Sequence, residues 1–189
     1  MARVRTFIAV AVPDRVSAAL AALKRKLEAD HAGVKWVVEK DLHLTLFFLG
    51  EVEQLDLVPI CRAVQQVASR HGAFGLEVTG VGGFPNTRRP KVLWAGVGGE
   101  GIDALHAMHA DLEAALMALG HYRREERAYT PHLTLGRLSQ EERDEAWGPV
   151  FKEYATWTAG AFPVAEILVM GSELRRAGPE YTVIGRAAL

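Results

Sequence analysis

The chain has 189 residues with a formal net charge of −1, and 49% of its residues are hydrophobic while 24% are charged. This composition is typical of an ordinary globular protein and excludes a disordered or fibrous chain. The near-neutral charge argues against a broad basic face that tracks extended nucleic acid duplex, but it is compatible with a local phosphate site.

The cysteine content and the lengths of the apolar runs indicate where in the cell the protein is expected. Cys61 is the only cysteine, so no internal disulfide can form. The apolar run near the amino terminus is too short to span a membrane and is ended by Pro13. We therefore expect a cytoplasmic protein with no membrane association, and we expect a monomer.

Alternating and helical apolar patterns follow one another along the first half of the chain. The expected strands cover residues 6–12, 34–38, 43–50 and 74–84, and the expected helices cover residues 13–30 and 54–70. The first helix has a proline at its first turn, where proline is well tolerated. These elements form one β/α unit.

A similar order of elements returns in the second half. Strands are expected at residues 91–97, 132–137, 165–174 and 180–189, and helices at residues 101–120 and 139–154. Either half alone would expose a large apolar sheet face. We therefore expect a single α+β domain, residues 1–189, with two pseudo-symmetric β/α lobes (about 1–88 and 89–189) whose antiparallel sheets face a central cleft.

The tetrapeptide H-L-T-L occurs twice, beginning at His43 and at His132. Because side chains alternate along a strand, His43 and Thr45 share one face, and His132 and Thr134 do the same in the second copy. If an approximate two-fold axis relates the lobes, both polar pairs face the cleft. One small group would then meet two imidazoles and two hydroxyls.

These residue types suit acid–base chemistry at a phosphoester. Histidine can donate or accept a proton near neutral pH, and a threonine hydroxyl can donate to an anionic oxygen. A single histidine in a strand is more often packed in the core or exposed at an edge, but the second copy favours a shared active site. The residues themselves do not assign acid and base.

Both motifs and their flanks resemble the two-histidine phosphoesterases, and most closely the LigT-like RNA 2′,3′-cyclic phosphodiesterases first described as 2′-5′ RNA ligases. The resemblance covers "RTFIAVAVP", "VKWVVEKDLHLTLFFLGEV", "FPNTRRPKVLWAGV" and "YTPHLTLGR". It implies a bilobed α+β fold. It also implies that terminal 2′,3′-cyclic phosphates, on RNA ends or small cyclic nucleotides, are hydrolysed to 2′-phosphomonoesters without a metal or other cofactor.

The resemblance also implies roles for the motif residues. His43 would be the proton donor to the departing 3′ oxygen, and His132 would be the proton acceptor that activates water. Thr45 and Thr134 would bind the non-bridging phosphate oxygens.

Two further residues are candidates for substrate binding. Arg137 matches a phosphate-binding arginine of the family, yet its odd offset from His132 points it away from the site unless Gly136 permits a bulge or the strand ends there. Tyr129 could stack on a base or pack at the start of the strand.

Several alternatives stay open. The same site could join RNA ends by attack of a ribose hydroxyl, or the protein could be an RNA-end binding module without useful turnover. His106 and His109 have a spacing that can build part of a metal site, but surface imidazoles explain them more simply. The basic stretch 86–91 could be a phosphate-attracting rim, although a solvated loop is favoured.

Overall fold

The computed structural model describes residues 2–123, 127–139, 147–175 and 178–189. Within these residues the strands are β1 (Arg3–Ala11), β2 (Val34–Trp36), β3 (His43–Glu53), β4 (Phe74–Phe84), β5 (Val92–Gly98), β6 (His132–Leu138), β7 (Thr158–Val164), β8 (Glu166–Arg175) and β9 (Gly178–Ala188). The helices are α1 (Asp14–Asp30), α2 (Leu57–Ala68), α3 (Ile102–Ala118) and α5 (Gly148–Glu153), with short 3₁₀ turns η1 (Glu39–Asp41) and η2 (Gln54–Asp56). The predicted α+β class is confirmed.

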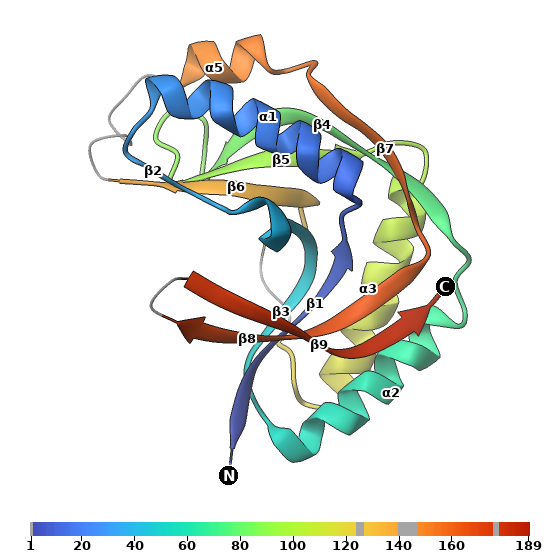
Figure 1. Ribbon diagram of the computed structural model, residues 1–189. Coiled ribbons are helices and arrows are strands. Elements are labelled where there is room, and N and C mark those ends of the chain that lie inside the picture. The colour runs from blue at the N-terminus through green and yellow to red at the C-terminus, as the bar shows by residue number, and fades with distance from the viewer. Residues whose placement is uncertain (1, 124–126, 140–146, 176–177) are drawn as a thin grey trace.

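The strands form one antiparallel sheet that curls into an open half-barrel (Figure 1). Its order is β7-β4-β5-β6-β3-β1-β8-β9, and β2 adds to the edge of β6. Between β6 and β3, the described residues show a single pair, Leu44 with Leu133. The sheet therefore consists of two four-stranded parts joined at the two H-L-T-L motifs, with β2 as a ninth strand paired to β6.

Each half of the sequence contributes strands to both parts of the sheet. β4, from the first half, pairs with β5, whereas β8, from the second half, pairs with β1 and carries β9 on its other side. The chain division near residues 88 and 89 therefore does not coincide with the division of the sheet. Because the halves exchange strands, neither sheet part could form from one half alone.

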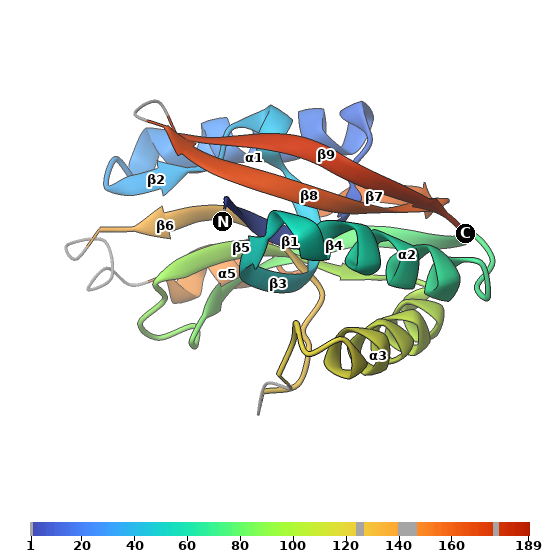
Figure 2. The same cartoon turned by 90° about the horizontal axis from the view of Figure 1, so that it is seen from below.

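Helices cover the sheet through regularly spaced apolar residues. In α1, Val16, Leu20, Leu23 and Leu27 recur at helical spacing and are buried, and the helix contacts β7. α2 and α3 lie side by side, and α2 contacts β8 and β9 (Figure 1, Figure 2). No helix among the described residues has the length and apolar character needed to cross a membrane.

The structure differs from the sequence-based prediction at two elements. The pattern did not predict β7, because Gly160 and Pro163 interrupt its alternation; β7 lies at the edge of the sheet, where proline is tolerated. The helix expected at 139–154 is seen as α5 over Gly148–Glu153, and residues 140–146 of that expectation lie outside the described residues.

Candidate active site

The junction between β3 and β6 brings the two motifs together. Leu44 and Leu133 pair across the junction and are fully buried. In an antiparallel pair this register directs His43 toward Thr134 and Thr45 toward His132, with all four side chains on the face opposite the leucines. The structure therefore brings the four residues together on neighbouring strands of one curled sheet, whereas the sequence-based expectation had the two pairs face one another across a cleft between lobes.

Both imidazoles are held in the same way by their own chain. Nδ1 of His43 lies 2.7 Å from the carbonyl oxygen of Asp41, and Nδ1 of His132 lies 2.7 Å from that of Thr130. A carbonyl can only accept, so Nδ1 carries the proton in each ring and Nε2 is left for proton transfer. Pro131 restricts Thr130 to an extended backbone, which helps direct the second carbonyl.

Burial governs the protonation of the two histidines. Desolvation lowers the pKa of both His43 and His132 below the usual 6.5, and the hydrogen bonds to the backbone oppose this shift in part. The negative charge of Asp41 also raises the pKa of His43, whereas no carboxylate acts comparably on His132 among the described residues. The Asp41 carboxylate therefore opposes part of the desolvation at His43, although the pKa of each histidine remains lowered.

Aromatic rings surround each imidazole. The His43 ring centroid lies 4.8 Å from that of Phe7 and 5.3 Å from that of Tyr181. The His132 ring lies 4.8 Å from Phe84 and 6.4 Å from Trp94. Sequence reasoning missed these four residues.

They come from four different strands. For Phe84 and Phe7, the only sequence signal of a place near the site is that each is an aromatic residue in a predicted strand. No local pattern marks Tyr181 or Trp94 as a neighbour of a distant histidine, because strand pairing alone brings them there.

A bulge in β6 settles the orientation of Arg137. Two consecutive residues of β5 pair with Thr134 and Gly136, so Leu135 is an extra residue on β6. The bulge reverses the alternation beyond it, and Arg137 therefore lies on the same face as Thr134. The bulge that the odd spacing required is present.

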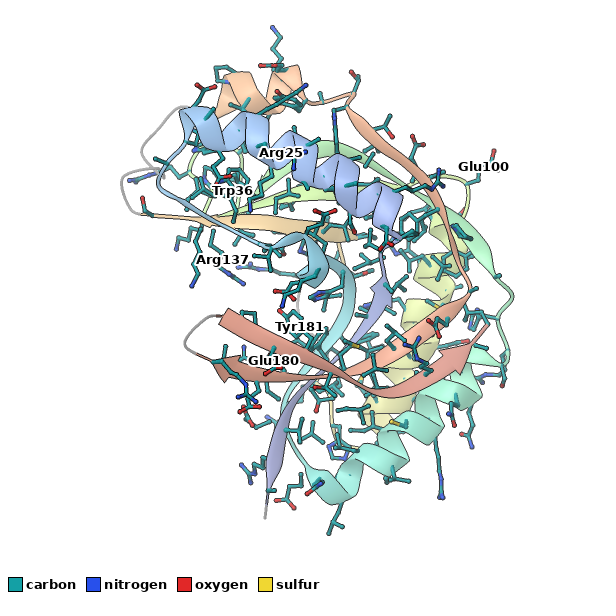
Figure 3. The ribbon with its side chains drawn as sticks, viewed as in Figure 1. Arg25, Trp36, Glu100, Arg137, Glu180 and Tyr181 are labelled. Carbon is teal, nitrogen blue, oxygen red and sulfur yellow. The ribbon has the colours of Figure 1, made fainter. Side chains whose placement is uncertain are left out.

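The pKa of the Tyr181 hydroxyl is shifted by charged groups on this face of the sheet. Burial and the Asp41 carboxylate raise its pKa, whereas Arg5 and Arg137 lower it. Figure 3 shows Arg137 on β6 and Tyr181 on β9 pointing toward one another across the gap between these strands. The site thus combines two imidazoles with guanidinium groups that can attract an anion.

Tyr129 packs at the start of β6. Its hydroxyl donates to the carbonyl oxygen of Thr45 at 3.0 Å, and its ring stacks on His109 with the centroids 3.9 Å apart. His109 in turn stacks on Phe47 and bonds to the carbonyl of Leu46 at 3.2 Å. These contacts belong to the packing role weighed for Tyr129, and stacking on a base stays a prediction.

The possible metal-site histidines make other contacts. His109 lies in the stack just described, and the ring of His106 meets Tyr129 edge-on at 6.2 Å. Within the described residues, no group of three or more His, Cys, Asp or Glu side chains is arranged to hold a metal ion.

The chain is similar in sequence to known proteins over nearly its whole length. The family model described as LigT like Phosphoesterase matches residues 10–94 and again residues 97–181, one match for each motif. An RNA 2′,3′-cyclic phosphodiesterase of Methanothermobacter thermautotrophicus is 31% identical over 180 residues, covering 95% of this chain and 96% of that protein. One of Aquifex aeolicus is 27% identical over 181 residues, covering 96% and 95%.

Solved structures show the same fold. A crystal structure of a Thermus thermophilus protein covers 98% of this chain and 97% of its own, with 29% identity and a TM-score of 0.79. The structure of E. coli LigT complexed with 3′-AMP covers 100% and 99%, with 25% identity and a TM-score of 0.74.

Proposed function

The chain belongs to the LigT-like phosphoesterase family, and from this membership we propose that it is an RNA 2′,3′-cyclic phosphodiesterase. It opens the cyclic phosphate of RNA or nucleotide ends to a 2′-phosphomonoester. The observation that supports this function most directly is the pair of imidazoles at the β3–β6 junction, each with Nδ1 bonded to a carbonyl and Nε2 left for proton transfer.

The proposed reaction transfers two protons. Nε2 of His132 takes a proton from water, whose oxygen forms a bond to phosphorus while the bond from phosphorus to the 3′ oxygen breaks. Nε2 of His43 gives its proton to that departing oxygen, which leaves a 3′ hydroxyl and a 2′ phosphate. The Asp41 charge beside His43 supports the donor role there, and an anionic substrate between the rings favours imidazolium further.

The threonines and Arg137 stabilise the phosphate in this proposal. Thr45 and Thr134 project beside the opposite histidines, so each can donate its hydroxyl to a non-bridging oxygen. Arg137 lies about 7 Å from Thr134 along the strand, two register steps away, and its guanidinium can reach back to the same phosphate. The groups that stabilise the transition state are then all supplied by side chains, with no metal ion.

The test is product identification in the presence of EDTA. The protein is incubated with a 2′,3′-cyclic mononucleotide and with an oligoribonucleotide bearing that end. The proposal expects a 2′-phosphomonoester from both, at rates that EDTA leaves unchanged. Undiminished cyclic phosphate on both substrates would refute the hydrolase function.

The same incubation separates the alternatives. Joined oligonucleotides with a 2′-5′ linkage would favour the ligase, and binding without any product would favour the RNA-end binding module. A cytoplasmic location and a monomeric state remain predictions that fractionation and light scattering can check.

A further inference from the structure

We propose that Lys35, beside Arg137, forms a second phosphate subsite for the nucleotide upstream of the reacting end. This inference rests on the proposed function and concerns RNA ends, which carry an upstream phosphate that cyclic mononucleotides lack. The subsite would bind the backbone phosphate on the 5′ side of the terminal nucleotide.

Strand register places the two cations together. β2 has three residues and pairs with β6, with Lys35 directly opposite Arg137. Residues opposite one another in an antiparallel ladder share a face, at a Cα separation of about 5 Å. Because the bulge at Leu135 turns Arg137 to the face of Thr134, Lys35 lies on that face too.

Within the described parts of the chain, no carboxylate pairs with either cation, Lys35 or Arg137, and both side chains are exposed. Like charges directly opposite one another destabilise a sheet. Consecutive phosphates of one RNA strand, the cyclic one near Arg137 and the preceding one near Lys35, would reduce this repulsion.

The distance of Lys35 from the reacting group indicates which phosphate it would bind, the terminal cyclic phosphate or the preceding backbone phosphate. The cyclic phosphate would lie at the junction between Thr45 and Thr134. Arg137 is about 7 Å further along β6, and Lys35 is one strand beyond it, a further 5 Å or so. Lys35 therefore lies farther than Arg137 from the terminal phosphate, and we assign it to the preceding one. Contact with a backbone phosphate carries no base preference.

The experiment compares two substrates with matched variants. One is a 2′,3′-cyclic mononucleotide, and the other is a trinucleotide with the same cyclic end. Kinetics are measured for the wild-type protein, for Lys35→Ala and for Lys26→Ala, an exposed lysine of α1 that removes the same charge elsewhere.

For Lys35→Ala we expect KM for the trinucleotide to rise roughly three- to tenfold, with KM for the mononucleotide unchanged. The slope of log KM against log salt for the trinucleotide should fall by about 0.7, the value for one lost phosphate contact on a single strand. Lys35→Arg should restore both quantities, and Lys26→Ala should match the wild type.

Equal effects of Lys35→Ala on the two substrates, or no effect on either, would overturn the subsite. The proposed function would stand in that case, because the wild-type protein would still hydrolyse the cyclic ends. If the wild-type protein hydrolysed neither substrate, both proposals would fail. Far-UV circular dichroism checks that each variant is folded.

Discussion

Replacing Gly82 with alanine should destabilise the protein and impair the site together. The Trp94 ring lies across the face of Gly82, and a Cβ there would sit 2.8 Å from Cε2 and closer still to two other ring atoms. Such contacts are too short to persist, so the ring must move. Trp94 pairs with Thr134 and lies 6.4 Å from His132, and its movement therefore reaches the active face.

The size of the effect follows from this overlap. Inserting a methyl group into a close-packed position costs about 1–3 kcal/mol, and the lower backbone entropy of alanine in the unfolded chain offsets about 0.4–1 kcal/mol. We expect a net loss of about 1–2 kcal/mol in the free energy of unfolding. For a chain of this length that corresponds to a fall in Tm of roughly 2–8 °C.

Urea and thermal unfolding measure this loss, and turnover of a cyclic nucleotide measures the effect on the site. Gly75→Ala is the matched control, because Gly75 lies in the same strand and an added Cβ meets nothing within 4 Å. We expect Gly75→Ala to keep wild-type activity and to be as stable as the wild type or up to about 1 kcal/mol more stable. If Gly82→Ala had the same free energy of unfolding and the same turnover rate as Gly75→Ala, the reasoning from the Trp94 contact would be refuted.

Three further predictions concern the catalytic face. Tyr129→Phe keeps the ring stack but removes the hydroxyl bond to Thr45, so it should lower stability by about 1 kcal/mol and lower kcat with little change in KM; unchanged kcat would argue against a positioning role. Burial disfavours the imidazolium, so each histidine should lose its proton below pH 6.5 in the free protein. NMR titration of His43 and His132 checks this, and an apparent pKa at or above 6.5 would contradict it. With a p-nitrophenyl phosphodiester, whose leaving group needs no proton, His43→Ala should keep far more activity than His132→Ala, and the reverse order would exchange the acid and base roles.

Local patterns predicted the elements that build the site but not their pairing. Residues 74–84 were predicted as a strand and form β4 with those bounds, and β3 and β6 begin at their histidines. The pairing of β4 with β5 and of β8 with β1 depends on contacts far apart in the chain. No local periodicity reports such contacts, so the exchange of strands between halves could not be predicted.

The same limit applies within the site. Alternation alone places His43 with Thr45 and His132 with Thr134, because strand geometry repeats every two residues. The face of Arg137 depends on a bulge that is defined only against β5. The aromatic neighbours of the histidines lie on four separate strands, so their positions beside the histidines could not be predicted without knowledge of the strand pairing.

Turnover of a 2′,3′-cyclic nucleotide in EDTA by His43→Ala and His132→Ala tests the central claim most directly. If the two imidazoles form one acid–base pair, each variant should lose at least about 100-fold in kcat while its unfolding transition stays close to that of the wild-type protein. Wild-type turnover by either folded variant would contradict the paired-histidine mechanism.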